Sequence, residues 1–178
     1  MTRSELEHLL RAAGAIADDP EIVVIGSQSI LGQFPDAPPD LRVSMEADLY
    51  PRNRPERADL VDDAIGEGST FHEQFGYYAQ GVGERTAILP RNWRERLVRL
   101  KNANTGGVAG MCLDVHDLAI SKYVAGRQKD LAFTAALARY RMTGKKTLLE
   151  RAAQTTLTPA QRKLVIGRIG RDFPVRKG

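Results

Sequence analysis

At 178 residues, with 42% hydrophobic residues and a net charge of +4, the chain has the length of one domain with a small appendage and can bury a substantial core. It has no run of about 20 apolar residues, and its first residues (MTRSELEHLL) lack a signal-peptide core, so we expect a cytoplasmic protein with no membrane partner. The single cysteine, Cys112, argues against an internal disulfide or a cysteine-based metal cage, and we expect it to be buried.

The N-terminal half of the sequence alternates between helical and strand patterns. Residues 4–17 open with a capping box of Ser4 and Glu7 and continue with leucines at helical spacing. The run EIVVIG (21–26) predicts a covered strand, SQSILGQ (27–33) a short helix, and RVSMEADLYP (42–51) a second strand. Residues 54–68 predict a helix that ends at Gly66 or Gly68 and buries Leu60, Val61, Ala64 and Ile65.

The C-terminal half predicts short strands followed by helices. Strands are expected at 75–82, 85–89, 97–100 and 108–113. One long helix is expected over 114–142, with two more at 143–154 and 158–173. The order predicts an α/β (α+β) fold with a mixed sheet, and we place a core in residues 1–138 and a basic helical segment in residues 139–178.

The charge is unevenly distributed along the chain. The segment from Arg139 to Gly178 holds eleven Lys and Arg against two acids, a balance of +9, which leaves −5 for the rest. An acidic body with a basic tail suggests a polyanionic partner such as a nucleic acid, whereas the alternative is an ordinary solvated helical surface.

Three features suggest a site for a nucleotide and a metal ion. Gly26 and Ser27 end a strand where a phosphate could approach the backbone and a hydroxyl donor, although a strand-to-helix turn also requires glycine for geometry alone. Strand alternation puts Glu46 and Asp48 on one face, as hard-oxygen ligands for Mg²⁺ or Mn²⁺, unless that face is simply solvated.

The third feature is a basic stripe in the long predicted helix. Lys122 and Lys129 stand two helical turns apart, with Gly126 between them and Asp130 at the end. Such a stripe suits a triphosphate, but lysines at this spacing are also typical of a solvated amphipathic face.

In combination and order, these features resemble the nucleotidyltransferase superfamily. The likeness runs from Ile22 to Leu137, through VVIGSQSILG, SMEADLY, FHEQFGYYAQGV, LPRNWRERL and, most distinctively, CLDVHDLAISKYVAGRQKDLAF. Within the superfamily, the chain is similar to the AbiEii/MenT-type toxins, above all the short mycobacterial MenT proteins.

The resemblance implies a polymerase-β-like core that transfers nucleotides from NTPs with Mg²⁺. MenT-type toxins add pyrimidine nucleotides, from CTP or UTP, to the 3′ end of tRNA, which blocks aminoacylation, and a cognate antitoxin protein restrains them. Carried over by position, Gly26 and Ser27 hold the triphosphate together with Lys122 and Lys129, Glu46 and Asp48 bind the metal, and Asp130 completes the catalytic set.

The chain departs from the superfamily pattern at two points. Glu46 stands where the first acid is usually Asp, so Asp48 is the more secure ligand. The later predicted strands offer no third acid apart from Glu84 in their turn, so either Asp130 substitutes or two acids suffice. Two further readings stay open: the same fold acting on a protein or small-molecule hydroxyl, and a non-catalytic RNA-binding relative.

Overall fold

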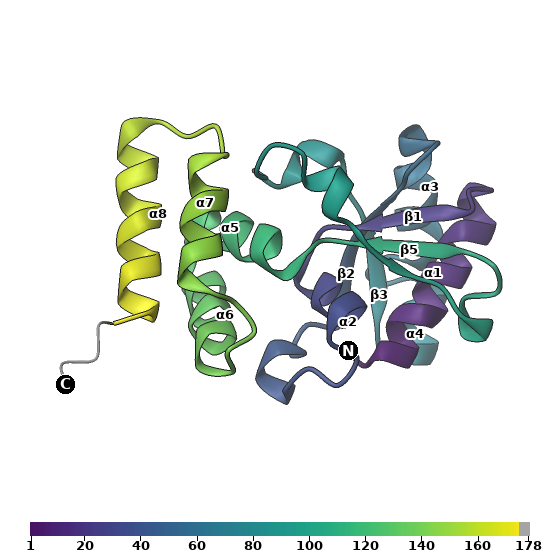
Figure 1. The fold of residues 1–178 in the computed structure, drawn as a ribbon. Coiled ribbons are helices and arrows are strands. Elements are labelled where there is room, and N and C mark those ends of the chain that lie inside the picture. Colours follow the sequence, from purple (N-terminus) through teal and green to yellow (C-terminus); the bar gives the residue numbers. More distant parts are fainter. Residues whose placement is uncertain (175–178) are drawn as a thin grey trace. The chain divides into compact units, whose positions relative to one another are not determined.

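The protein is described here by a computed structural model, which describes residues 1–174. The chain forms two compact units (Figure 1). The first, which we call the sheet unit, contains Met1–Thr86 and Arg96–Asp114, and the second, the helical unit, contains Ala87–Glu95 and the chain from Val115 onward. None of the helices in residues 1–174 combines the length and apolar character needed to cross a bilayer.

The sheet unit is built on five strands, in the spatial order β3-β2-β1-β5-β4. Strand β1 pairs antiparallel with β2 and parallel with β5, β2 pairs parallel with β3, and β4 pairs antiparallel with β5. The predicted α+β fold with a mixed sheet is therefore confirmed. The strands are β1 (Glu21–Val24), β2 (Glu46–Pro51), β3 (Tyr78–Gly81), β4 (Val98–Leu100) and β5 (Ala109–Cys112).

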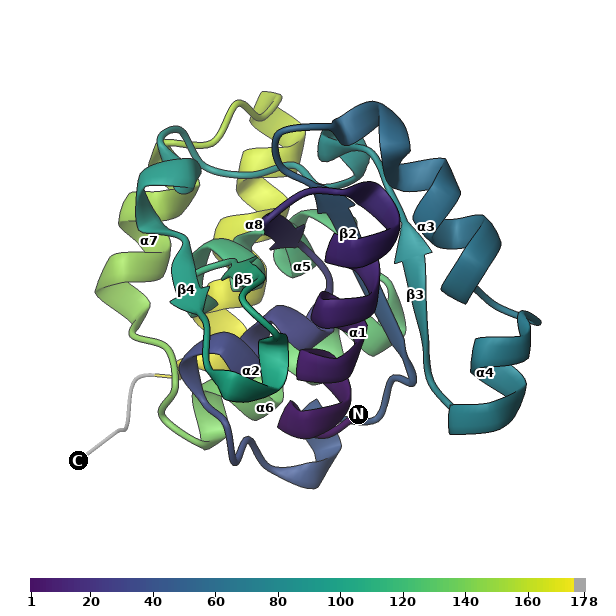
Figure 2. The ribbon, with the colours of Figure 1, turned by 90° about the vertical axis from the view of Figure 1, so that its right-hand side faces the viewer.

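One face of this sheet is covered by helices of the same unit (Figure 2). Glycines leave the space for this close packing, because they have no Cβ. Leu10 of α1 lies over Gly110, Ala58 of α3 lies over Gly81, and Gly32 of α2 lies against Cys112. The thiol of Cys112 is fully buried, as expected, and burial raises its pKa to about 12. The helices are α1 (Arg3–Ala17), α2 (Ile30–Gln33), α3 (Ala58–Ile65) and α4 (Thr70–Phe75).

The helical unit is the bundle expected at the C-terminal end. Helix α5 packs on the three helices that follow it, and α7 packs on α8. Its core includes Tyr123, whose hydroxyl donates to Asp172 Oδ2 at 2.9 Å. Helices α5 and α6 thus group with the C-terminal helices, whereas the sequence analysis placed residues 1–138 together. The helices are α5 (Val115–Ala125), α6 (Gln128–Arg139), α7 (Lys145–Ala153) and α8 (Pro159–Asp172).

Three local expectations in the sheet unit were wrong. Helix α1 is capped by Thr2 and Glu5 rather than by Ser4 and Glu7, so its N-cap lies two residues earlier than expected. Leu60 is 51% exposed and Ala64 is exposed, because α3 begins at Ala58 and turns Ala58, Val61 and Ile65 inward. Residues 85–89 form no strand; Glu84–Thr86 form a 3-10 turn instead.

The expected continuous helix over 114–142 is also wrong. Gly126, at φ 66°, ends α5 in a left-handed conformation, and its N–H donates to the Lys122 carbonyl. A Cβ at this position would overlap the Arg168 guanidinium, which donates to the Tyr123 carbonyl. Gly126 is therefore a helix terminator that also makes room for a side chain of α8.

Candidate active site

The Gly-Ser corner and Asp48 lie directly against each other. The N–H of Ile25 donates to the Asp48 carbonyl at 3.0 Å, which brings the end of β1 alongside β2. A Cβ on Gly26 would lie 2.7 Å from Asp48 Cγ, closer than real side chains approach. Gly26 has an ordinary φ of −84°, so this position requires glycine for space rather than for backbone conformation.

Polar groups follow Gly26 in a short 3-10 turn, Ser27–Ser29, that leads into α2. Ser27 is half-buried, while Gln28 and Ser29 are fully buried. Within the part of the chain that the structure describes, Gln28 Oε1 and Ser29 Oγ have no hydrogen-bond partner. Buried polar atoms without partners are costly, so they suit a bound polar ligand or an ordered water.

Glu46 and Asp48 share the face of β2 opposite Ala47 and Leu49, which are fully buried. The predicted alternation is therefore confirmed. The parallel register places Tyr78 beside Glu46, and the Tyr78 hydroxyl donates to Glu46 Oε2 at 3.2 Å. Burial, followed by the negative charge of Glu46, raises the pKa of Tyr78 to about 12, so the hydroxyl keeps its proton at neutral pH.

These two carboxylates fit a magnesium ion that is shared with a substrate. Among residues 1–174 no cluster of three or more His, Cys, Asp or Glu side chains could hold a metal. Mg²⁺ commonly takes only one or two carboxylates and completes its shell with water and substrate phosphates. The hard oxygens of Glu46 and Asp48, on one face of β2, match that pattern.

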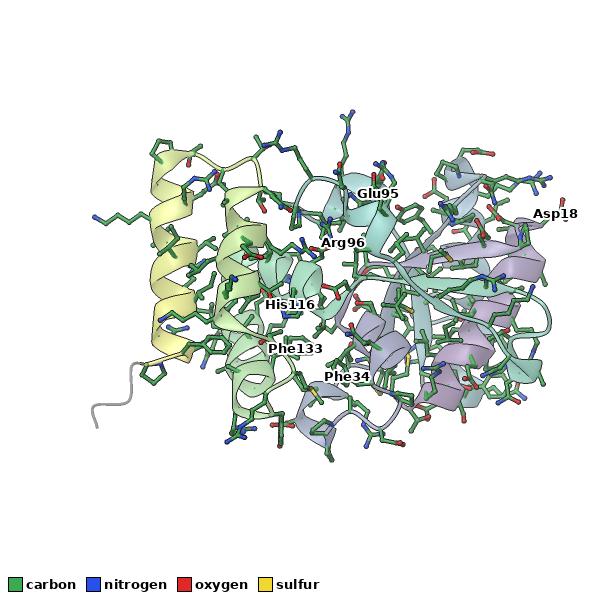
Figure 3. The ribbon with its side chains drawn as sticks, in the orientation of Figure 1. Asp18, Phe34, Glu95, Arg96, His116 and Phe133 are labelled. Carbon is green, nitrogen blue, oxygen red and sulfur yellow. The ribbon has the colours of Figure 1, made fainter. Side chains whose placement is uncertain are left out.

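In the helical unit, Lys122 and Asp130 form an ion pair, with Nζ 3.5 Å from Oδ1. The ammonium group also lies 5.9 Å from the centre of the Phe133 ring, which is labelled in Figure 3. Lys122 is thus held in place by an acid and an aromatic ring.

Asp130 is almost fully buried and lies in the first turn of α6. Its carboxylate accepts from Arg127 Nε at 2.6 Å and from the Arg127 backbone N–H at 3.3 Å. Burial alone would raise its pKa, but the Arg127 hydrogen bonds and the Lys122 charge outweigh burial and lower it. Its observed contacts are those of a helix cap and a lysine partner, and its catalytic role stays a prediction.

Lys129 does not extend the stripe that the sequence suggested. Because Gly126 breaks the helix, Lys122 lies near the end of α5 and Lys129 in the first turn of α6, where it is exposed. The expectation of one shared helical face was therefore wrong, and a role for Lys129 in nucleotide binding stays a prediction.

The sequence analysis did not predict the hydrogen bond between Tyr78 and Glu46. Residues 75–82 were predicted only as a strand, without a partner strand. The contact follows from the parallel register of β2 and β3, which local periodicity does not encode. The buried pair Gln28 and Ser29 could have drawn attention as polar residues next to the Gly-Ser corner.

A five-stranded mixed sheet with a glycine-serine corner against one carboxylate, and a second carboxylate two residues earlier, defines a nucleotidyltransferase-like core. Residues 4–161 match a family model described as "Nucleotidyltransferase of unknown function (DUF6036)", and the chain belongs to this family. Searches of curated proteins and of solved structures found no significant match.

Proposed function

We propose that the protein is a Mg²⁺-dependent nucleotidyltransferase that adds a nucleotide, from CTP or UTP, to the 3′ end of tRNA. The family supports nucleotidyl transfer in general. The observation that carries the proposal is the close approach of Gly26 to Asp48, with Glu46 on the same face of β2. In this proposal the phosphates bind beside the Gly-Ser corner, next to the two carboxylates.

Each residue of the corner has a role in this proposal. Gly26 and Ser27 bind the triphosphate through the backbone and the serine hydroxyl. Glu46 and Asp48 would hold Mg²⁺, which when bound offsets phosphate charge and favours ionisation of the attacking hydroxyl. The resemblance also assigns Lys122 to the triphosphate; within the helical unit its ammonium group pairs with Asp130.

The reaction is an in-line displacement at the α-phosphorus. The 3′-hydroxyl oxygen of the RNA forms a new bond to phosphorus while the bond to the leaving pyrophosphate breaks, and the hydroxyl proton passes to solvent. Side chains of this chain position the two reactants and stabilise charge, which is where enzymes of this chemistry gain most of their rate.

The choice of RNA as acceptor rests on charge. The helical unit contains 16 Lys and Arg against five Asp and Glu, a net charge of +11, whereas the sheet unit has ten against 17, a net charge of −7. A basic surface of this kind favours binding to nucleic-acid phosphates. A small-molecule acceptor would have no need of it.

A toxin role is part of the proposal and rests on the resemblance to AbiEii/MenT-type proteins. In this role, the added nucleotides block aminoacylation, and an antitoxin protein restrains the activity. Induced expression in a bacterial host tests it: the wild type should stop growth, and Asp48→Ala should not. Normal growth with abundant, folded wild-type protein would contradict the toxin role but not the chemistry.

The transferase activity is tested with each of the four labelled NTPs, Mg²⁺, and total tRNA in one arm or protein extract in another. Label on tRNA, strongest with CTP or UTP, supports the proposal. Label on protein would establish the alternative acceptor. No label in any arm, from folded protein, would favour the non-catalytic RNA-binding alternative.

A further inference from the structure

Tyr78 bonds to Met45 through its backbone and to the neighbouring Glu46 through its side chain. Its N–H donates to the Met45 carbonyl at 3.0 Å, directly before Glu46, and its hydroxyl donates to Glu46 Oε2 at 3.2 Å. Each contact alone would be ordinary in a parallel strand pair. Together they hold the phenol oxygen at a fixed place relative to β2.

The Tyr78 ring packs against His72 of α4. The rings of Tyr78 and His72 lie 4.6 Å apart between centres, at 52°. His72 is fixed in turn, because its Nδ1 accepts from the Gly68 N–H at 3.0 Å and its backbone N–H donates to Ser69 Oγ at 3.1 Å. Glu46 is therefore held by a chain of contacts that runs back through a capped helix.

Glu46 needs such support more than aspartate would. A glutamate has one more rotatable bond, so an unsupported carboxylate at this position would move over a wider range than that of Asp48. Beside a second negative charge, the hydroxyl dipole of Tyr78 also partly offsets the repulsion between the two carboxylates.

We propose that Tyr78 is a positioning residue for Glu46: its hydroxyl holds Oε2 and thereby leaves Oε1 to bind the metal ion. The inference rests on the proposed function, because it assumes that Glu46 and Asp48 are metal ligands. Hydrogen bonds of this kind to a metal-binding carboxylate fix its orientation, and their loss typically weakens metal binding about 10- to 100-fold.

The test is Tyr78→Phe, which keeps the ring against His72 and removes only the hydroxyl. Mn²⁺ binding, measured by electron paramagnetic resonance and by calorimetry with and without CTP, should weaken about tenfold, and excess Mn²⁺ should restore transfer. Tyr77→Phe is the matched control, because the Tyr77 hydroxyl bonds to His8 Nδ1 instead, at 2.8 Å. It should bind Mn²⁺ as the wild type does, and thermal unfolding checks that both variants fold.

A double-mutant cycle shows whether the hydroxyl acts through Glu46. In a Glu46→Gln background, Tyr78→Phe should cause little further loss of Mn²⁺ affinity; an undiminished further loss would overturn the inference. If Tyr78→Phe alone binds Mn²⁺ like the wild type, the inference fails and the proposed site stands. If the wild type binds no Mn²⁺ at all, the proposed metal site fails together with it.

Discussion

The two units differ in what their charged residues do. In the sheet unit, which carries a net charge of −7, Glu46 and Asp48 share one face of β2, and Asp48 lies against Gly26. In the helical unit, at +11, Lys122 and Arg127 pair with the buried acid Asp130, and Arg151 pairs with the buried acid Asp117. The difference suggests that the sheet unit determines the rate of transfer and the helical unit the affinity for RNA. Substitutions in the two should therefore change different measured quantities.

The largest effect is expected for Asp48→Ala in the sheet unit. Loss of a metal-binding carboxylate should lower kcat by about a thousandfold or more, because charge in the transition state loses its stabilisation. RNA affinity should stay close to that of the wild type. The matched control is Asp63→Ala, at an exposed acid of α3, which should keep full activity. Equal activity of the two variants would mean that Asp48 is not in the site.

A methyl group at Gly26 should have the next largest effect. Gly26→Ala must displace the Asp48 side chain, and a misplacement of about 1 Å can cost a hundredfold in rate. Gly83→Ala is the control, because a Cβ there meets no atom within 4 Å. Full transfer activity in Gly26→Ala, measured with the same labelled-NTP assay, would show that the corner tolerates rearrangement and that its tight packing is unrelated to catalysis.

Asp130→Asn should weaken the helical unit by about 2 kcal/mol, since the buried acid loses charged hydrogen bonds to Arg127 and its Lys122 partner. The folded-state pKa of Asp130 is lowered, so its contribution to the free energy of unfolding is present above its ordinary pKa, near 4, and is lost as the pH falls below it.

Urea unfolding at pH 7 and pH 3 measures the Asp130 effect. Asp130→Asn should be less stable than the wild type at pH 7, and the gap should narrow at pH 3. Glu150→Gln, at an exposed acid of α7, should leave stability unchanged at both values. If the difference in the free energy of unfolding between wild type and Asp130→Asn is the same at pH 7 and pH 3, the charge of Asp130 does not contribute to stability.

The smallest effect is expected for single lysines of the helical unit. Lys146 and Lys163 are exposed, whereas Arg162 donates to two backbone carbonyls, at Ala152 and Thr155, and should be left intact. Lys146→Gln with Lys163→Gln should weaken tRNA binding about tenfold and reduce its salt dependence by about two ions, with KM for the NTP unchanged. Lys101→Gln in the sheet unit should change neither tRNA affinity nor its salt dependence. Unaltered tRNA binding in the double variant would mean that Lys146 and Lys163 are not part of the RNA-binding surface.

In the sheet unit, local sequence patterns predicted the positions of strands and turns better than the contacts between them. The period-two alternation of β2 was enough to place Glu46 and Asp48 on one face, and the Gly-Ser signal was enough to place a turn after β1. The meeting of Gly26 with Asp48 and the bond from Tyr78 to Glu46 depend on how strands pair, and pairing is a long-range property.

In the helical unit, a local pattern gave a wrong secondary-structure prediction. Continuous helical periodicity through Gly126 suggested one helix, because a single glycine costs a helix only about 1 kcal/mol. The break occurs at Gly126, whose left-handed backbone ends α5, and it separates Lys122 from Lys129. The Arg168 guanidinium, from far along the chain, occupies the space that a Cβ at this position would need.

A crystal structure with Mn²⁺ and a non-hydrolysable CTP analogue tests the central claim most directly. The anomalous signal of manganese should fall between the carboxylates of Glu46 and Asp48, with the triphosphate against Gly26 and Ser27. Manganese and nucleotide bound elsewhere, with Glu46 and Asp48 contacting neither, would contradict the claim that this corner is the active site.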